Sequence, residues 1–188
     1  CQNRFNGMWA FAIWDNKDKE LFISRDRFGV KPLYYMFHDN FFILCSEIKS
    51  ILPLTELAPN YQEFYGYLLD GPSNAHKDTF FKNVYRFPAG TSSKYNIRKE
   101  KKELFFNKYW KLEAPVNNGS FSEKKLKDYS KEYYFLLKDA VKVRLFADVN
   151  VSCALSGGLD SSSIVYLACK ILEEGGGDRA TLSTVSNV

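Results

Sequence analysis

Apolar runs separated by polar turns predict a β-meander in the first fifty residues. The runs occupy positions 8–14, 21–24, 33–37 and 41–45, and the breaks between them are rich in Asp, Asn, Lys, Gly and Pro. The first run contains no polar side chain, so we expect its strand to be buried on both faces. Ser46 is expected to cap a short helix that follows the fourth run.

The next sixty residues alternate between helical and extended patterns. Apolar residues at helical spacing predict a helix over 60–69. Residues 79–95 are expected to be extended, with a turn at 87–90. A charge run at 98–103 is typical of a solvated hairpin tip, and residues 109–112 predict a short strand.

A linker at 114–119, which contains Pro, Asn-Asn and Gly, precedes a different pattern. Ser120 and Glu123 have the spacing of a capping box, and apolar residues at helical spacing continue from there to Arg144. The remaining pattern is a strand over 149–155, a Gly-rich loop, a helix over 163–172 and a strand over 181–185. This order is that of a βαβ unit, which begins a parallel α/β sheet. The predicted domains are 1–113 and 120–188.

Composition narrows the class of protein. The 188 residues carry 26 Lys+Arg against 22 Asp+Glu, and a net charge of +4 is too small to indicate a nucleic-acid or membrane partner. With 16 Phe, 12 Tyr and 3 Trp, the chain is not expected to be disordered. No apolar run reaches the roughly 20 residues of a bilayer span. The cysteines match no metal motif, and with no signal peptide this favours a reducing, cytoplasmic compartment.

One motif carries candidate chemistry, and it lies between the predicted strand and helix of the βαβ unit: Ser156, Gly157, Gly158, Leu159, Asp160, Ser161 and Ser162. Open α/β sheets bind ligands at this point, where glycines admit an anion to the backbone and helix N–H groups favour phosphate. Asp160 would repel a bare phosphate, which predicts a bridging divalent cation. Because no Walker lysine follows, a mononucleotide held by backbone and hydroxyl groups fits best. The alternative is a Gly-Ser turn whose aspartate only caps the helix.

The motif resembles the PP-loop of ATP pyrophosphatases, which cleave ATP between the α and β phosphates. The upstream chain resembles the second half of the glutaminase domain of asparagine synthetases, in the segments 4–15, 25–35, 46–52, 87–90, 109–110 and 148–151. A glutaminase-type block followed by a PP-loop is more specific than either alone. Nearly the whole chain is therefore similar to the glutamine-hydrolysing asparagine synthetases and their close relatives.

This resemblance implies an α+β fold followed by an α/β fold. The first is the C-terminal half of an αββα N-terminal-nucleophile glutaminase domain, and the second is the start of a parallel PP-loop synthetase domain. In such enzymes an N-terminal cysteine hydrolyses glutamine, and ammonia passes through a tunnel. ATP and Mg²⁺ then serve to adenylate the side-chain carboxylate of aspartate, which yields asparagine, AMP and pyrophosphate.

The resemblance also assigns residues. The implied ATP-binding positions are Ala154, Leu155, Ser156, Gly157, Gly158, Asp160, Ser161, Ser162 and Thr184. Asp160 is the implied Mg²⁺ ligand, while Ala154 and Thr184 would meet the adenine. The implied partners are small molecules (ATP, aspartate, and glutamine or ammonia) without nucleic acid or membrane, and a homodimer stays open.

The chain begins without Met and ends just after a predicted strand, so we expect a fragment that is inactive alone and exposes apolar surface. The glutaminase nucleophile is then expected outside it, with Cys1 an interior residue. Arg25, Asp26, Arg27 and Lys31 form a charged cluster, either at a domain interface or tunnel mouth, or as a local ion-pair network.

Three alternatives stay open for the function. A related acyl-adenylating amidotransferase or cyclase would act on another acid, in a cell-surface or secondary-metabolite pathway. A PP-loop enzyme acting on tRNA is disfavoured by the block from Phe5 to Leu52. An inactive remnant is disfavoured by the intact Ser/Gly-rich motif.

Overall fold

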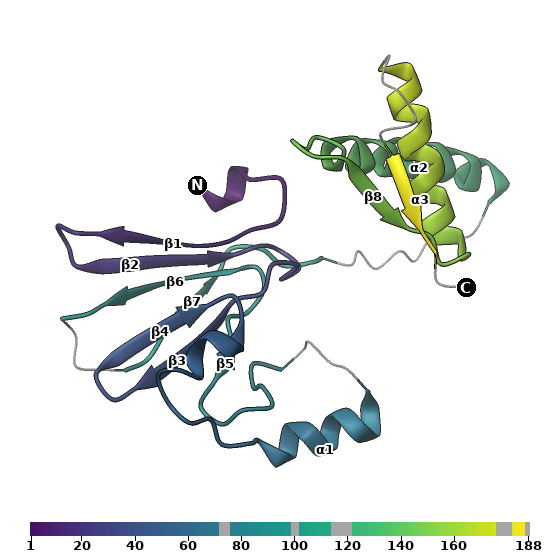
Figure 1. Cartoon of the computed structure of the whole chain (residues 1–188). Helices are drawn as coiled ribbons and strands as arrows, with labels where there is room; N and C mark the ends of the chain where they lie inside the picture. Colours follow the sequence, from purple (N-terminus) through teal and green to yellow (C-terminus); the bar gives the residue numbers. More distant parts are fainter. Residues whose placement is uncertain (72–75, 99–101, 114–121, 176–181, 187–188) are drawn as a thin grey trace. The chain divides into compact units, whose positions relative to one another are not determined.

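The computed structural model describes residues 1–71, 76–98, 102–113, 122–175 and 182–186 (Figure 1). The chain divides into two compact units, Cys1–Ala114 and Pro115–Val188. The linker predicted at 114–119 and the capping position Ser120 lie outside the described residues.

In its described part, the first unit contains two antiparallel sheets. One has the strand order β1 (Ala10–Asp15), β2 (Glu20–Arg25), β6 (Thr91–Asn96) and β7 (Phe106–Lys108), and the other has the order β4 (Phe41–Cys45), β3 (Tyr34–His38) and β5 (Tyr85–Arg86). All four strands expected in the first fifty residues are confirmed. The prediction of a single β-meander was wrong, because the loop between β2 and β3 takes the chain from one sheet to the other. The helical segments among the described residues of this unit are η1 (Gln2–Arg4), η2 (Ile48–Ile51) and α1 (Tyr61–Asp70).

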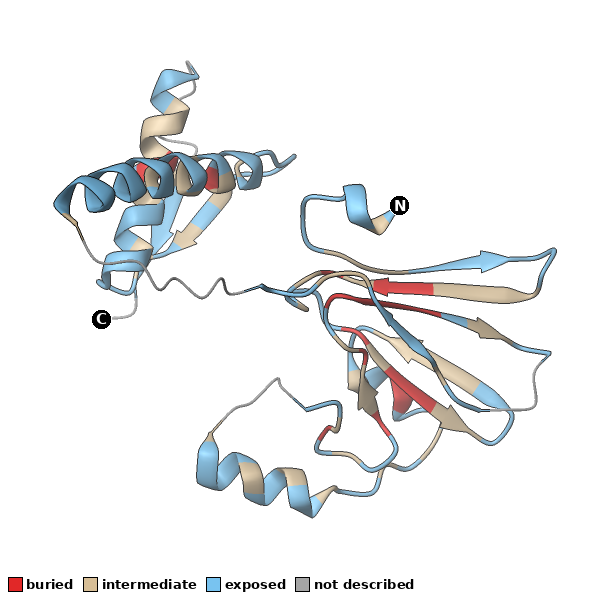
Figure 2. Ribbon diagram, turned by 180° about the vertical axis from the view of Figure 1, so that it is seen from behind, coloured by how far each residue is buried: buried red, intermediate tan, exposed pale blue. Residues whose placement is uncertain are grey.

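The main core of this unit lies between the two sheets, where Figure 2 shows the buried residues. Ile23 of β2 meets Tyr35 of β3 and Phe87 there. Met36, the next residue of β3, points to the other side and packs on Ile51 of η2. Strand β3 is therefore covered on both faces, since alternate side chains enter different clusters.

The strand expected to be buried on both faces, β1, is not. Its Ile13 is 54% exposed and its Trp14 is 44% exposed. β1 forms the edge of its sheet and pairs with β2 alone among the described strands. A continuous apolar run shows only that a strand prefers burial, and it does not show which other segment covers it.

Two local predictions were also wrong. Ser46 caps no helix: the short η2 begins at Ile48 after Glu47, without a side-chain cap. No strand forms at 109–112, because β7 ends before it and the N–H groups of Tyr109 and Trp110 both donate to the Gly90 carbonyl, at 3.0 and 3.3 Å.

Gly90 is expected to be intolerant of a side chain. Its φ is +65°, and a Cβ would lie 3.0 Å from the Trp110 carbonyl oxygen. Gly90→Ala should destabilise the first unit by about 1–3 kcal/mol, because it adds both a left-handed alanine and a backbone clash. Thermal denaturation of the full-length gene product checks this. Gly66→Ala is the matched control, since its Cβ would meet nothing within 4 Å in helix α1 and should be neutral or stabilising.

Tyr35 is expected to make the first unit sensitive to alkali. Burial raises the pKa of its phenol from 10.0 to about 12, with smaller contributions from Tyr85 and Asp78. Because the phenol keeps its proton longer in the folded than in the unfolded state, its contribution is complete below pH 10 and is lost as the pH rises toward 12. The melting temperature should therefore fall more steeply between pH 9.5 and 11.5 in the parent protein than in Tyr35→Phe. Equal slopes would contradict the prediction.

The second unit is the βαβ unit with one preceding helix. It contains α2 (Glu123–Arg144), β8 (Val151–Ala154), α3 (Leu159–Glu174) and β9 (Leu182–Val185), and β8 and β9 pair in parallel as expected. Val141 of α2 packs against Leu167 and Ala168 of α3. Ser122 caps α2, accepting the Lys125 N–H at 3.2 Å, so the helix starts beyond the expected Ser120 box. Within the described residues, no helix has the length and apolar character needed to span a membrane.

Candidate nucleotide-binding site

The Ser/Gly-rich motif joins β8 to α3 at the edge where both parallel strands end. Leu155 follows β8 directly and donates its N–H to the Val185 carbonyl at 2.9 Å, which ties the start of the loop to β9. Gly158 is the N-cap of α3, and Leu159 is its first residue. The helix was expected from residue 163, but its first turn already holds three predicted site residues, Asp160, Ser161 and Ser162.

The Ser161 hydroxyl stabilises this loop through hydrogen bonds within it. Its Oγ accepts the Ser156 N–H at 3.3 Å, donates to the Gly158 carbonyl at 3.2 Å, and lies 3.1 Å from the Ser156 Oγ. The sequence suggested that both hydroxyls are donors for a ligand, and it did not reveal this internal role. The sequence does contain a signal for this role, because Ser161 lies three residues after the N-cap Gly158. At that spacing a hydroxyl can reach back to the carbonyl of the N-cap residue.

The amino end of α3 is open to an anion. Gly158 provides no side-chain cap, so the first backbone N–H groups of the helix are left for a ligand or water. Gly157 has a φ of +79°, and apart from the residues on either side of it no described residue has an atom within 4 Å of where its Cβ would be. A ligand would therefore meet bare backbone on an exposed loop.

Asp160 is the acidic group of the site. It lies in the first turn of α3 and is exposed. No group of three His, Cys, Asp or Glu side chains among the described residues could hold a metal. A single carboxylate beside the Ser/Gly-rich loop is still compatible with Mg²⁺, because this ion commonly uses one or two carboxylates together with substrate phosphates.

The two predicted adenine contacts come from neighbouring strands but from opposite faces of them. Ala154 pairs with Val185, and Thr184 pairs with Cys153 one position earlier. Paired side chains share a face, as the Ser152 and Ser183 hydroxyls show at 2.5 Å. Because side chains alternate along a strand, the Thr184 side chain lies on the face opposite to that of Ala154. The two side chains therefore cannot both lie against the same face of an adenine ring, whereas the Ala154 backbone and the Thr184 side chain are not separated in this way.

In the first unit, the cluster of charged residues after β2 is not an ion-pair network. The Asp26 carboxylate is 1% exposed and accepts three backbone N–H groups, from Phe28, Val30 and Lys31, at 3.0–3.1 Å. The Arg25 guanidinium donates to three backbone carbonyls, at 2.6–2.8 Å. Both side chains therefore hold the loop in shape by bonding its backbone. Arg27 donates to the Phe5 carbonyl at 2.8 Å and was not expected in this role.

Comparison with known proteins assigns both halves of the chain. Residues 1–110 match the family described as glutamine amidotransferase domain, which is more than half of the sequence. The chain belongs to this family. Residues 132–186 match the family described as asparagine synthase, and this match includes the Ser/Gly-rich loop. The resemblance inferred from the sequence motifs is thereby confirmed.

Curated relatives of this chain agree with the two matches. It is 40% identical to a putative glutamine-hydrolysing asparagine synthetase 2 of Methanocaldococcus jannaschii, over 88% of the chain and 31% of that relative. It is 34% identical to glutamine-hydrolysing asparagine synthetase 3 of Bacillus subtilis, over 99% of the chain and 29% of the relative. The amidase chry2 of Gibberella zeae is 34% identical, over 92% of the chain and 25% of the relative. The chain thus spans a quarter to a third of the length of these relatives.

Proposed function

We propose that this chain is part of an ATP-dependent glutamine amidotransferase that converts aspartate to asparagine. The observation that carries the proposal is the phosphate-type loop between β8 and α3, downstream of a glutamine amidotransferase domain in the same chain. A carboxylate is a poor acyl donor, and joining it to AMP supplies a good leaving group. The described loop offers backbone N–H groups and hydroxyls, which support a role in binding the phosphates of ATP.

Each loop residue has a proposed task. The backbone N–H groups after Gly157 and Gly158, with the hydroxyls of Ser156 and Ser162, would bind the β and γ phosphates as pyrophosphate departs. Ser161 would hold the loop in its binding shape through its bonds to Ser156 and Gly158. The adenine would lie at the carboxyl edge of the strands, against the backbone of Ala154 and Leu155 and the side chain of Thr184.

Asp160 would hold Mg²⁺. When bound, this ion neutralises the charge that develops on the departing pyrophosphate. Asp160 fits this task because its carboxylate is exposed in the first helical turn, next to the open N–H groups. Phosphate oxygens and water would supply the other ligands.

The proposed sequence has two bond exchanges. An oxygen of the aspartate side-chain carboxylate attacks the α-phosphorus of ATP, and pyrophosphate leaves. Ammonia, released from glutamine or supplied as ammonium, then attacks the activated carbon, loses a proton, and displaces AMP. The architecture proposed around these steps is a glutaminase domain of the αββα class followed by a parallel PP-loop domain, divided near 113–120. The cytoplasmic location and a homodimer stay predictions.

The test uses the full-length gene product with ATP, Mg²⁺, aspartate and either glutamine or ammonium. Asparagine and AMP should form in equal amounts with both nitrogen sources. Activity with ammonium alone would contradict glutamine use. A folded protein that forms no AMP with any acid would overturn the proposal.

One observation favours a second candidate, which is the same chemistry on another acid. The amidase of Gibberella zeae and the asparagine synthetase 3 of Bacillus subtilis are equally similar to this chain, at 34% identity. A panel of carboxylic acids in the AMP assay separates the two candidates. AMP formation with another acid and not with aspartate would select the second one.

A further inference from the structure

The outer edge of β1 presents a row of backbone groups that bond to no strand among the described residues. One hydrogen bond fixes which residues these are. The Asp26 N–H donates to the Trp9 carbonyl at 2.9 Å, and because bonding alternates along an antiparallel pair, Phe11 and Ile13 also direct their N–H and carbonyl groups to β2. The residues between them direct theirs to the free edge: Ala10, Ala12 and Trp14.

Strand β1 has few of the features with which edge strands avoid further pairing. Its residues from Ala10 to Asp15 include no Pro and no Lys, and its register with β2 continues without a bulge. Its one charged residue is the last. The opposite edge of the same sheet, β7, is three residues long and ends at Lys108. Of these two edges, which Figure 1 shows, β7 has the short, charged form that suits exposure to solvent, and β1 does not.

Both faces of β1 carry exposed apolar side chains. Ile13 and Trp14 are 54% and 44% exposed, and as neighbours in a strand they point to opposite faces of the sheet. Figure 2 shows most of this strand as exposed. A helix that packed on one face would cover one of the two side chains. A further strand beside β1 would contact both, because its own side chains also alternate between the faces.

We propose that β1 is an interior strand in the full-length gene product, and that an extended segment outside residues 1–188 pairs with its free edge. This segment would bond to the backbone of Ala12 and would place apolar side chains beside Ile13 on one face and Trp14 on the other. More than two thirds of the length of the Methanocaldococcus jannaschii and Bacillus subtilis relatives lies outside the matched region. A segment of the same molecule also has a higher effective concentration than a separate partner. The proposal does not depend on the synthetase reaction.

Hydrogen exchange of the full-length gene product, resolved to single amides, tests whether the edge is paired. The N–H groups of Phe11 and Ile13 bond to β2 and should be protected in either case. The N–H groups of Ala12 and Trp14 should also be protected, about 10²-fold or more, because each would donate to the added strand. Exchange of these two amides at the rate of an exposed chain would overturn the proposal.

A photo-reactive side chain on β1 identifies what pairs with it. Irradiation of the purified full-length variant Trp14→p-benzoylphenylalanine should join residue 14 to a segment of the same molecule outside residues 1–188, which mass spectrometry of the digested protein locates. A product of twice the mass would show that a second copy supplies the strand, and this would overturn the proposal. Cross-links confined to residues 1–188 would overturn it as well.

Proline distinguishes the two edges of this sheet. The Tyr109 N–H donates to the Gly90 carbonyl, so by alternation the N–H of Lys108 points away from the sheet, as that of Ala12 does. Proline is tolerated where the N–H faces solvent and not where it serves a neighbouring strand. Ala12→Pro should therefore lower the melting temperature of the full-length gene product by about 3 °C or more relative to the matched control Lys108→Pro. Equal melting temperatures of the two variants would contradict pairing at β1.

Discussion

Asp160→Asn is expected to lower AMP formation by about 10²- to 10³-fold, since it removes the proposed Mg²⁺ ligand beside the phosphate loop. The amide keeps the size of the side chain and loses its charge. The fold should change little, because Asp160 is exposed and in no described ion pair. Steady-state measurement of AMP release at several Mg²⁺ concentrations checks the prediction.

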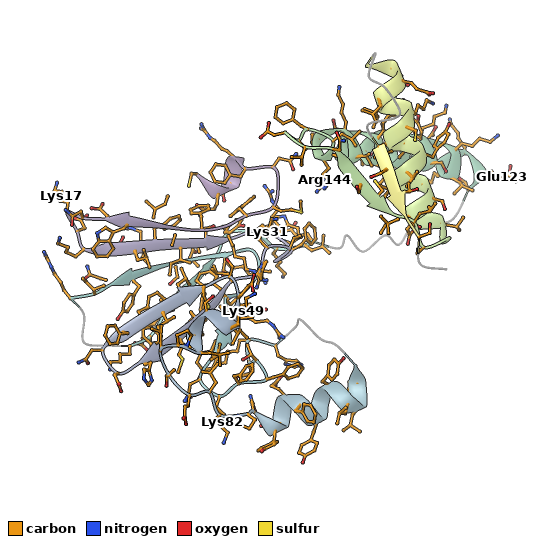
Figure 3. The ribbon with its side chains drawn as sticks, in the orientation of Figure 1. Lys17, Lys31, Lys49, Lys82, Glu123 and Arg144 are labelled. Carbon is orange, nitrogen blue, oxygen red and sulfur yellow. The ribbon has the colours of Figure 1, made fainter. Side chains whose placement is uncertain are left out.

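Glu123→Gln provides the matched control for this loss. Glu123 lies in the first turn of α2, as Asp160 lies in the first turn of α3, and Figure 3 labels it. Each substitution removes a favourable interaction with a helix dipole, worth about 0.3–1 kcal/mol. Only Asp160→Asn should affect AMP release. If both variants lose activity alike, the effect of Asp160 is structural and it holds no metal.

The second large effect is expected at Asp26. Asp26→Ala leaves three backbone N–H groups of the loop without the buried carboxylate that accepts them, and should destabilise the first unit by about 3–5 kcal/mol. The loop it organises also positions Arg25, whose bonds reach the Phe87 carbonyl. Hydrogen exchange of the full-length gene product should show lost protection in peptides that cover β2 and β3.

Asp15→Ala is the control for Asp26→Ala. The Asp15 carboxylate also accepts two backbone N–H groups, from Lys17 and Asp18, but in an exposed turn where water replaces it. Its loss should cost about 1 kcal/mol or less. If hydrogen exchange changes by a similar amount in the two variants, burial of the Asp26 carboxylate is not the reason for its larger effect.

Local pattern was enough to predict most elements of the fold. The strands β2, β3 and β4, helix α1 and the βαβ unit follow from periodicity and from turn residues such as Gly71, whose φ is +80° at the end of α1. Pairing between distant segments was not predictable. The partition of the first four strands into two sheets depends on β5, about 50 residues after its partner β3, and on β6, about 70 residues after its partner β2.

In the candidate site, too, local features were predictable from the sequence and contacts between residues were not. The Ser and Gly residues from 156 to 158 predicted a loop between strand and helix, but the helix was expected only from residue 163 and begins at Leu159. The internal bonds of Ser161 and the opposite faces of Ala154 and Thr184 needed coordinates. One of the two interpretations of the charged cluster was also wrong: an ion-pair network was an option for Arg25 and Asp26, whereas both side chains bond to the backbone.

The most direct test of the proposed function measures whether an oxygen atom passes from the aspartate side-chain carboxylate to AMP. Full-length gene product is supplied with ATP, Mg²⁺, ammonium and aspartate whose side-chain carboxylate is labelled with oxygen-18. Attack of that carboxylate on the α-phosphorus, followed by displacement at carbon, predicts one labelled oxygen in each AMP released with asparagine. Unlabelled AMP, or asparagine formed without AMP, would contradict adenylation at the Ser/Gly-rich loop.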